Sequence, residues 1–150
     1  MDMIKLSVPG TLLFRDVVLR VTASACRLAR AMAHPNQEQE PSREDHGFDD
    51  KVVSAVGEAF NNVAIHAYRG SAAGTVQLEF EMHWDRVTIR LLDHGFAFDP
   101  AEVHAPDLST LPESRMGLYI VRSCMDEVGY QPGAAPSAPN VLTLTKRYLP

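Results

Sequence analysis

The most informative segment of the chain is EAFNNVAIHAY, which runs from Glu58 to Tyr68. Its apolar residues recur at helical spacing, which predicts a helix with one apolar and one polar side. The polar side holds Glu58 and Asn62, and a separation of four residues stacks these side chains on one face. A proton-accepting carboxylate beside an amide oxygen that binds Mg²⁺ suits a phosphoryl-transfer site. A solvated helix face often contains the same residue types, so this segment alone leaves both interpretations open.

The composition is that of an ordinary globular protein. The 150 residues are 45% hydrophobic and 22% charged, which suffices for one domain, expected to span residues 1–150. A net charge of −5 argues against a general nucleic-acid binder, because phosphate backbones demand a basic surface. No apolar run is long enough to cross a membrane, no signal peptide is visible, and two cysteines form no disulfide framework or zinc site. We therefore expect a cytoplasmic protein without direct contact to nucleic acid or membrane.

The periodicity of apolar residues elsewhere predicts an α+β fold. Strands are expected at Met3–Val8, Val76–Trp84, Val87–Leu92 and Val141–Arg147, and helices at Leu12–Met32, Asp49–Tyr68 and from Gly117 to about Val128. Helices and strands come in separate groups, so we expect a two-layer α/β sandwich: a mixed, mostly antiparallel sheet with helices on one face. The polar segment between Asn36 and Gly47 is expected to be a loop, and Trp84 is expected in the core.

A second motif, DHGFAFDP, follows a predicted strand and runs from Asp93 to Pro100. An acid at a strand end can accept a hydrogen bond from the exocyclic amine of adenine, and Gly95 lets the backbone approach a flat ring because it has no Cβ. A third motif, from Arg115 to Val121, places Gly117 at the start of a helix, where free backbone N–H groups favour a phosphate. Each motif alone also fits a plain turn or an ordinary helix start.

In this order and on these elements, the three motifs resemble the GHKL (Bergerat-fold) ATPases, which include gyrase and the catalytic domains of histidine kinases. The resemblance covers the chain from about Leu6 to Arg147. The first motif is similar to the N box of that family, the second to its G1 box and the third to its G2 box. Within the family, the chain looks most like the anti-sigma factor serine/threonine-protein kinases.

The resemblance implies ATP and Mg²⁺ as cofactors and a role for each matching residue. Asn62 matches the Mg²⁺ ligand, Glu58 the general base, and Asp93 the acid that binds the adenine amine. The other implied nucleotide contacts are Gly95 and Ala97 of the G1 box, Met116, Gly117 and Leu118 of the G2 box, His66 past the N box and Thr143 on the last strand. Two positions depart from the family pattern: Ala97 replaces a glycine, and the G2 segment keeps a single glycine, Gly117.

The family pattern implies a kinase that phosphorylates a STAS-domain anti-sigma antagonist and sequesters a sigma factor, with a homodimer left open. The glycine-poor G2 segment favours an alternative: a nucleotide-regulated binding module of the same fold without efficient kinase activity. A histidine-kinase catalytic domain separated from its sensor fits less well, since the sequence shows no dimerising helix pair or phosphoacceptor segment.

Overall fold

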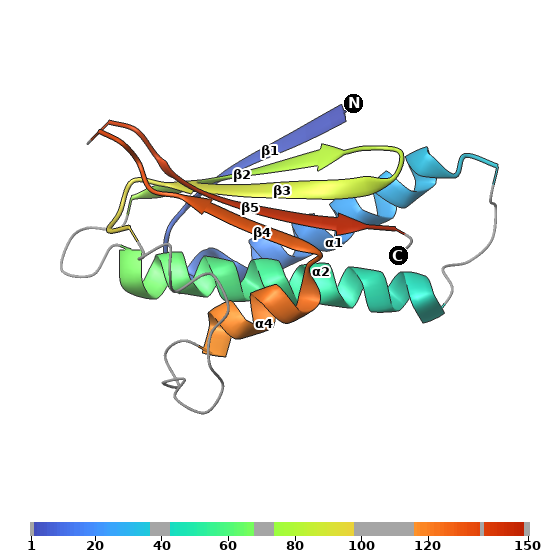
Figure 1. Cartoon of the computed structure of the whole chain (residues 1–150), viewed down its shortest axis with the longest axis horizontal. Coiled ribbons are helices and arrows are strands. Elements are labelled where there is room, and N and C mark those ends of the chain that lie inside the picture. The colour runs from blue at the N-terminus through green and yellow to red at the C-terminus, as the bar shows by residue number, and fades with distance from the viewer. Residues whose placement is uncertain (1, 37–42, 68–73, 98–115, 136, 149–150) are drawn as a thin grey trace.

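The computed structural model describes residues 2–36, 43–67, 74–97, 116–135 and 137–148, with the backbone alone for residues 43–45, 66 and 67. A sheet forms one layer and helices form the other (Figure 1). The strands are β1 (Asp2–Pro9), β2 (Thr75–Met82), β3 (Arg86–Asp93), β4 (Glu127–Gln131) and β5 (Asn140–Arg147). The helices are α1 (Arg15–Ala33), α2 (Arg43–Asn62) and α4 (Met116–Cys124), with a 3₁₀ turn at Leu12–Phe14 before α1 and a π-helical turn at Val63–Ala67 after α2.

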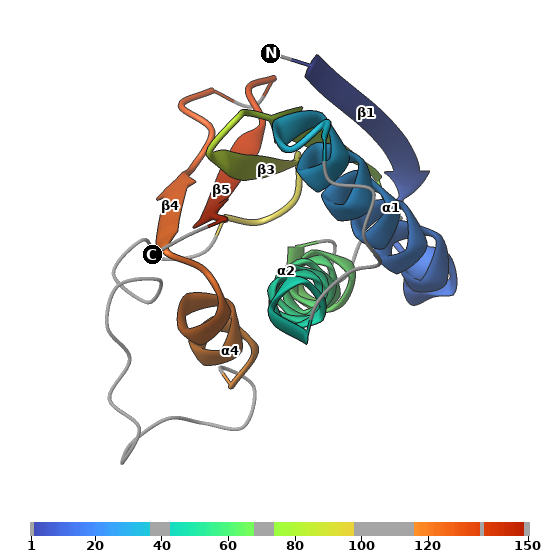
Figure 2. The ribbon, with the colours of Figure 1, turned by 90° about the vertical axis from the view of Figure 1, so that its right-hand side faces the viewer.

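The strands form one sheet in the order β1-β2-β3-β5-β4, and every neighbouring pair is antiparallel. Seen from the end, the helices cover one face of the sheet, with α2 between α1 and α4 (Figure 2). The expected α+β class and two-layer build are therefore confirmed. None of the described helices is long and apolar enough to span a membrane.

The core lies between α2 and the inner face of the sheet. Alternate residues of β2 and β3, such as Leu78, Phe80 and Ile89, are fully buried, as period-2 patterning predicts for a sheet with one covered face. On α2, Val56 and Phe60 are buried at helical spacing and belong to the same hydrophobic cluster. This stripe fixes the rotation of α2 about its axis.

Helices α1 and α2 differ from the sequence-based expectation. The buried stripe of α1 contains Val18, Thr22, Ala25, Cys26 and Ala29, whereas the apolar residues Val17, Leu28 and Met32, which helical spacing also assigns to one side, remain more than 40% exposed. Thr22 is tolerated inside because its hydroxyl donates to the Val18 carbonyl at 2.7 Å. Helix α2 begins at Arg43 rather than near Asp49, so part of the expected loop is helical.

Two further expectations were wrong at the ends of elements. The third helix ends at Cys124 instead of continuing through Val128, and residues 127–131 form β4, which pairs with β5 at the edge of the sheet. This strand is short and contains Gly129, so its sequence pattern is weak. Strand β2 ends at Met82 because the hairpin closes through a hydrogen bond from His83 N to Arg86 O, and Trp84 beyond it is 82% exposed.

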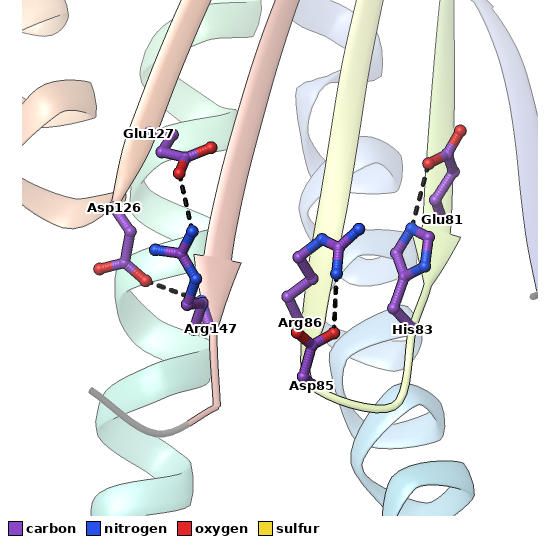
Figure 3. A network of polar contacts seen from close by, with 7 residues as sticks. All are labelled: Glu81, His83, Asp85, Arg86, Asp126, Glu127 and Arg147. Carbon is purple, nitrogen blue, oxygen red and sulfur yellow. Dashed lines mark hydrogen bonds and ion pairs between the residues drawn. The ribbon is translucent and has the colours of Figure 1, made fainter.

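Charged side chains crowd the hairpin end of the sheet, away from the carboxyl end of β3 (Figure 3). Glu81 contacts His83 Nε2 at 3.2 Å and forms a second ion pair with Arg90 on the neighbouring strand. At the same end of the sheet, Arg147 of β5 donates a hydrogen bond to Glu127 of β4 at 2.8 Å. Burial of Glu81 disfavours its ionised form, but hydrogen bonds from Arg90 and His83 outweigh burial and hold its pKa below the usual range.

We expect Glu81→Gln to make the protein less stable at neutral pH. A depressed folded-state pKa means that the carboxylate contributes stability above its unfolded pKa of about 4.3, and this contribution is lost as the pH falls through the folded-state pKa. The variant should lose roughly 1–3 kcal/mol of unfolding free energy at neutral pH. Its stability should also decline less steeply in acid, as measured by urea denaturation over a pH series.

Glu79→Gln is the matched control on the same strand and face. Glu79 Oε2 lies 3.8 Å from Lys5 Nζ, and the Lys5 side chain is 63% exposed, so this pair is longer and more strongly screened. The control should lose less stability than Glu81→Gln. Equal losses in the two variants would contradict a special role for the pair of Glu81 with Arg90.

Candidate functional site

Helices α2 and α4 meet where three of the predicted site residues come together. Gly117, in the first turn of α4, lies so close to α2 that a Cβ built on it would be 3.0 Å from Glu58 Oε2 and 3.5 Å from Asn62 Oδ1. A side chain at this position would press on the Glu58 carboxylate, so glycine lets the helix begin directly against both groups. The arrangement leaves a carboxylate, an amide and the first turn of a helix facing one another.

Asn62 is unusual for a buried polar residue. Asn62 is only 8% exposed, and its Nδ2 has no hydrogen-bond partner within the described residues. An unsatisfied buried polar group costs roughly 1–3 kcal/mol, so its retention calls for an explanation such as a missing ligand. The unpaired Nδ2 is a donor and fits an acceptor such as a phosphate oxygen, whereas Oδ1 is the atom of this amide that could hold Mg²⁺, which takes oxygen ligands and few of them from protein.

A second polar cluster lies at the carboxyl end of β3. Asp93 is 3% exposed, and its Oδ1 accepts hydrogen bonds from Gly95 N at 2.9 Å and from Asn140 Nδ2 at 3.1 Å. Burial raises the pKa of Asp93 above its usual value, although the hydrogen bonds from Asn140 and Gly95 and the charge of His94 oppose this shift. The carboxyl ends of β3 and α2 and the amino end of α4 lie toward the same end of the molecule (Figure 1).

The other residues predicted to contact the nucleotide either lie in less favourable positions or are described only in part. Met116 is 46% exposed at the start of α4, whereas Leu118 is 6% exposed and packs inward, so a contact of Leu118 with a ligand would come from its backbone. Ala97 lines a cavity of about 350 Å³ together with Gly95 and Asn140. The His66 backbone lies in the π-helical turn at Val63–Ala67. The His66 side chain is outside the described part of the structure.

Thr143 is not brought to Asp93. In the β3–β5 register, Thr143 is opposite Arg90, and Asp93 is opposite Asn140. Alternation places Asn140 on the face of Leu142 and Leu144, which is the inner face, and Thr143 on the outer face. Asn140 therefore occupies the position that sequence reasoning assigned to Thr143. The sequence signal that could have identified Asn140 is its place in the alternation of the strand. Asn140 is an even number of residues from the buried Leu142 and Leu144 and therefore shares their face.

The family is established by comparison with known proteins. Residues 17–146 match the model of the histidine kinase-like ATPase domain, which is most of the chain. The chain belongs to the histidine kinase-like ATPase family. This membership agrees with the resemblance seen in the three motifs.

Several relatives carry more specific names. A segment of 98 residues is 30% identical to the serine-protein kinase RsbW of Bacillus cereus, covering 58% of this chain and 60% of the relative. Another of 100 residues is 32% identical to RsbW of Bacillus licheniformis, covering 60% and 62%. The anti-sigma F factor of Clostridium beijerinckii is 37% identical over 79 residues, covering 50% and 55%. The matches thus span about half to three fifths of these relatives.

We expect Asn62→Leu to stabilise the protein in the absence of ligand. The substitution removes a buried amide nitrogen that lacks a partner among the described residues, and it puts an apolar group of similar volume in its place. Urea denaturation should show an unfolding free energy that is higher by about 1 kcal/mol. A residue kept for function at a cost in stability behaves in this way.

Asn61→Leu is the control one residue earlier. The Oδ1 atom of Asn61 accepts a hydrogen bond from Arg15 Nε at 2.9 Å, so its loss should lower stability. Destabilisation by Asn62→Leu of the same size as by Asn61→Leu would show that the Asn62 amide is satisfied in solution.

Proposed function

We propose that this chain binds ATP with Mg²⁺ between α2, α4 and the end of β3, and transfers the γ-phosphoryl group to a serine of a partner protein. The observation that carries the proposal is the joint approach of Glu58 and Asn62 to Gly117. The partner is a STAS-domain anti-sigma antagonist, and the protein also sequesters a sigma factor. The names of the relatives, serine-protein kinase RsbW and anti-sigma F factor, support this choice.

Each residue has a defined task in this proposal. Asp93 accepts a hydrogen bond from the exocyclic amine of adenine, and Gly95 leaves room for the ring. The first-turn N–H groups of α4 donate to phosphate oxygens, and Asn62 offers its amide oxygen to the metal. Mg²⁺ supplies charge neutralisation at the phosphates when bound. Glu58 accepts the proton of the attacking serine hydroxyl, which is the step that distinguishes phosphoryl transfer from binding alone.

The first test is nucleotide binding itself. Isothermal titration calorimetry with ATP and Mg²⁺ should detect a single site, and Asn62→Leu should weaken it because the amide oxygen is gone. Omitting Mg²⁺ should reduce the affinity of the wild type more than that of this variant. Absence of ATP binding by the wild type would contradict the proposal as a whole.

The second test concerns Glu58. We expect Glu58→Gln to retain ATP binding, since the side chain keeps its size, and to slow phosphorylation of the STAS-domain partner by about 10²–10⁴-fold, because an amide cannot accept the serine proton. Incorporation of radiolabelled phosphate from ATP measures the rate. Unchanged transfer by this variant would remove Glu58 from the role of base.

A second function remains distinguishable in the same experiment. The single glycine of the segment from Ser114 to Gly117 favours a nucleotide-regulated binding module, since fewer glycines allow less close wrapping of phosphates. In that case the wild type binds ATP and the partner but yields no phosphoserine. Glu58→Gln then leaves partner binding and its response to ATP unchanged.

A further inference from the structure

A cavity of about 380 Å³ lies at the hairpin end of the protein, where β5 ends and α2 begins (Figure 1). Its volume is in the range of pockets that hold small molecules. Gly47 in its wall and Asn62 in the candidate site are 15 residues apart on α2, which is roughly 20 Å. The walls that the following paragraphs use come from α2 and the end of β5, namely Gly47, Phe48, Lys51, Lys146, Arg147 and Tyr148.

Two aromatic rings form the apolar part of this cavity. The ring centroids of Phe48 and Tyr148 lie 5.3 Å apart, with the planes tilted by 38°. Burial raises the pKa of the Tyr148 hydroxyl to about 12, so this ring stays uncharged at neutral pH. The rings therefore offer a flat apolar group a surface that carries no negative charge.

Lys146 brings a positive charge to the same cavity. It is an even number of residues from the buried Leu142 and Leu144, so it belongs to the inner face of β5, and its side chain is only 14% exposed. Its Nζ lies 6.0 Å from the centroid of the Phe48 ring and 3.8 Å from Asp126 Oδ1, which is too long for a hydrogen bond. The described residues thus compensate this largely buried ammonium group only weakly, and such burial is costly.

The other charged groups around the cavity divide into paired and available ones. Asp126 Oδ2 accepts a hydrogen bond from Arg147 N at 2.7 Å, and the Arg147 guanidinium donates to Glu127 at 2.8 Å (Figure 3). Lys51 is exposed on α2, one helical turn after Gly47. The charge that a ligand would meet therefore comes mainly from the two lysines.

Gly47 leaves space beside the cavity at a cost to the helix, since glycine is a poor helix former. No described atom lies within 4 Å of a Cβ built on Gly47, so packing against the described residues does not require glycine there. By contrast, a Cβ on Gly57 of the same helix would lie 2.9 Å from a guanidinium nitrogen of Arg15. Gly57 is explained by helix packing, and Gly47 is explained by the open cavity.

We propose that this cavity is a second ligand site, which binds a small phosphomonoester whose phosphate is attached to a flat ring. The ring lies against Phe48 and Tyr148, and the phosphate oxygens accept hydrogen bonds from Lys146 and Lys51. A phosphomonoester carries about −1.5 to −2 charges at pH 7, so it suits two lysines better than a singly charged carboxylate does. The site is independent of the proposed ATP site.

The experiment titrates the full chain with 1-naphthyl phosphate by isothermal calorimetry. The wild type should bind this probe with a dissociation constant of about 1 mM or lower. Lys146→Met keeps the length of the side chain but removes the ammonium group, and it should weaken binding by about tenfold or more. Gly47→Leu should weaken binding as strongly, because its side chain fills the cavity. The carboxylate 1-naphthoate should bind the wild type more weakly than the phosphate, and the neutral 1-naphthol more weakly still.

Three variants serve as controls and should bind the probe as the wild type does. Lys5→Met removes the same charge from the outer face of β1, where the Lys5 side chain is 63% exposed. Gly47→Ala improves the helix but adds only a methyl group beside the cavity. Asn62→Leu changes the candidate nucleotide site at the other end of α2.

Unchanged binding by Lys146→Met would overturn the proposal, and so would an equal loss in Lys5→Met. A wild type that does not bind the probe, or that binds 1-naphthol or 1-naphthoate as tightly, would also overturn it. If Lys146→Met does not fold, unchanged binding by Gly47→Leu decides against the site independently. Loss of binding in Asn62→Leu would place the probe between α2 and α4 instead. A chain that binds the probe at this cavity but does not bind ATP would refute the proposed function alone.

Discussion

The arrangement of the site depends on the burial of one side of α2 against the sheet. Val56 and Phe60 of α2, and Val63 in the π-helical turn that continues it, are at most 2% exposed and belong to the core cluster shared with β2, β3 and β5. Rotating the helix would bring these side chains into water at about 1.5–3 kcal/mol each, so the rotation is firmly set. Glu58 and Asn62 lie on the flank of that stripe and consequently face α4. The hydrophobic effect, which has no direction of its own, thereby orients a carboxylate and an amide.

Two features of this end of the molecule work against stability. The amide nitrogen of Asn62 is buried without a partner in the described structure, and the carboxyl group of Asp93 is buried with a raised pKa. At the hairpin end, Glu81 and Arg147 are paired, whereas the Tyr148 hydroxyl is buried without a partner among the described residues. Unsatisfied or desolvated polar groups are expected where a ligand completes the hydrogen bonding, and paired ones where charge only supports the fold. Because the hairpin end also holds one such group, the buried polar groups near Asn62 and Asp93 support the candidate site only together with the motifs.

Much of the fold was predictable because its signals are local. Alternation in β2 and β3 and the helical stripe of α2 each follow from burial of one face, and all three elements are present. The edge strand β4 was not predicted, since a strand of five residues has little sequence pattern. The exposure of Trp84 was not predicted either, because an apolar residue just past the end of a strand can continue the alternation by chance. In α1, counting apolar residues missed Thr22, whose hydroxyl is satisfied within its own helix.

The two halves of the candidate site also differed in how well the sequence predicted them. Glu58 and Asn62 are four residues apart on one helix, so their proximity follows from helical geometry alone. Asp93 and Asn140 are 47 residues apart and meet only because β3 and β5 pair in one particular register. A slip of one residue would exchange the inner and outer faces and bring Thr143 and its neighbours to the opposite side. That register depends on the burial of Leu142 and Leu144, so core packing determines which residue becomes the partner of Asp93. From the sequence, this partner could be assigned only by counting alternate residues along the strand from those two leucines.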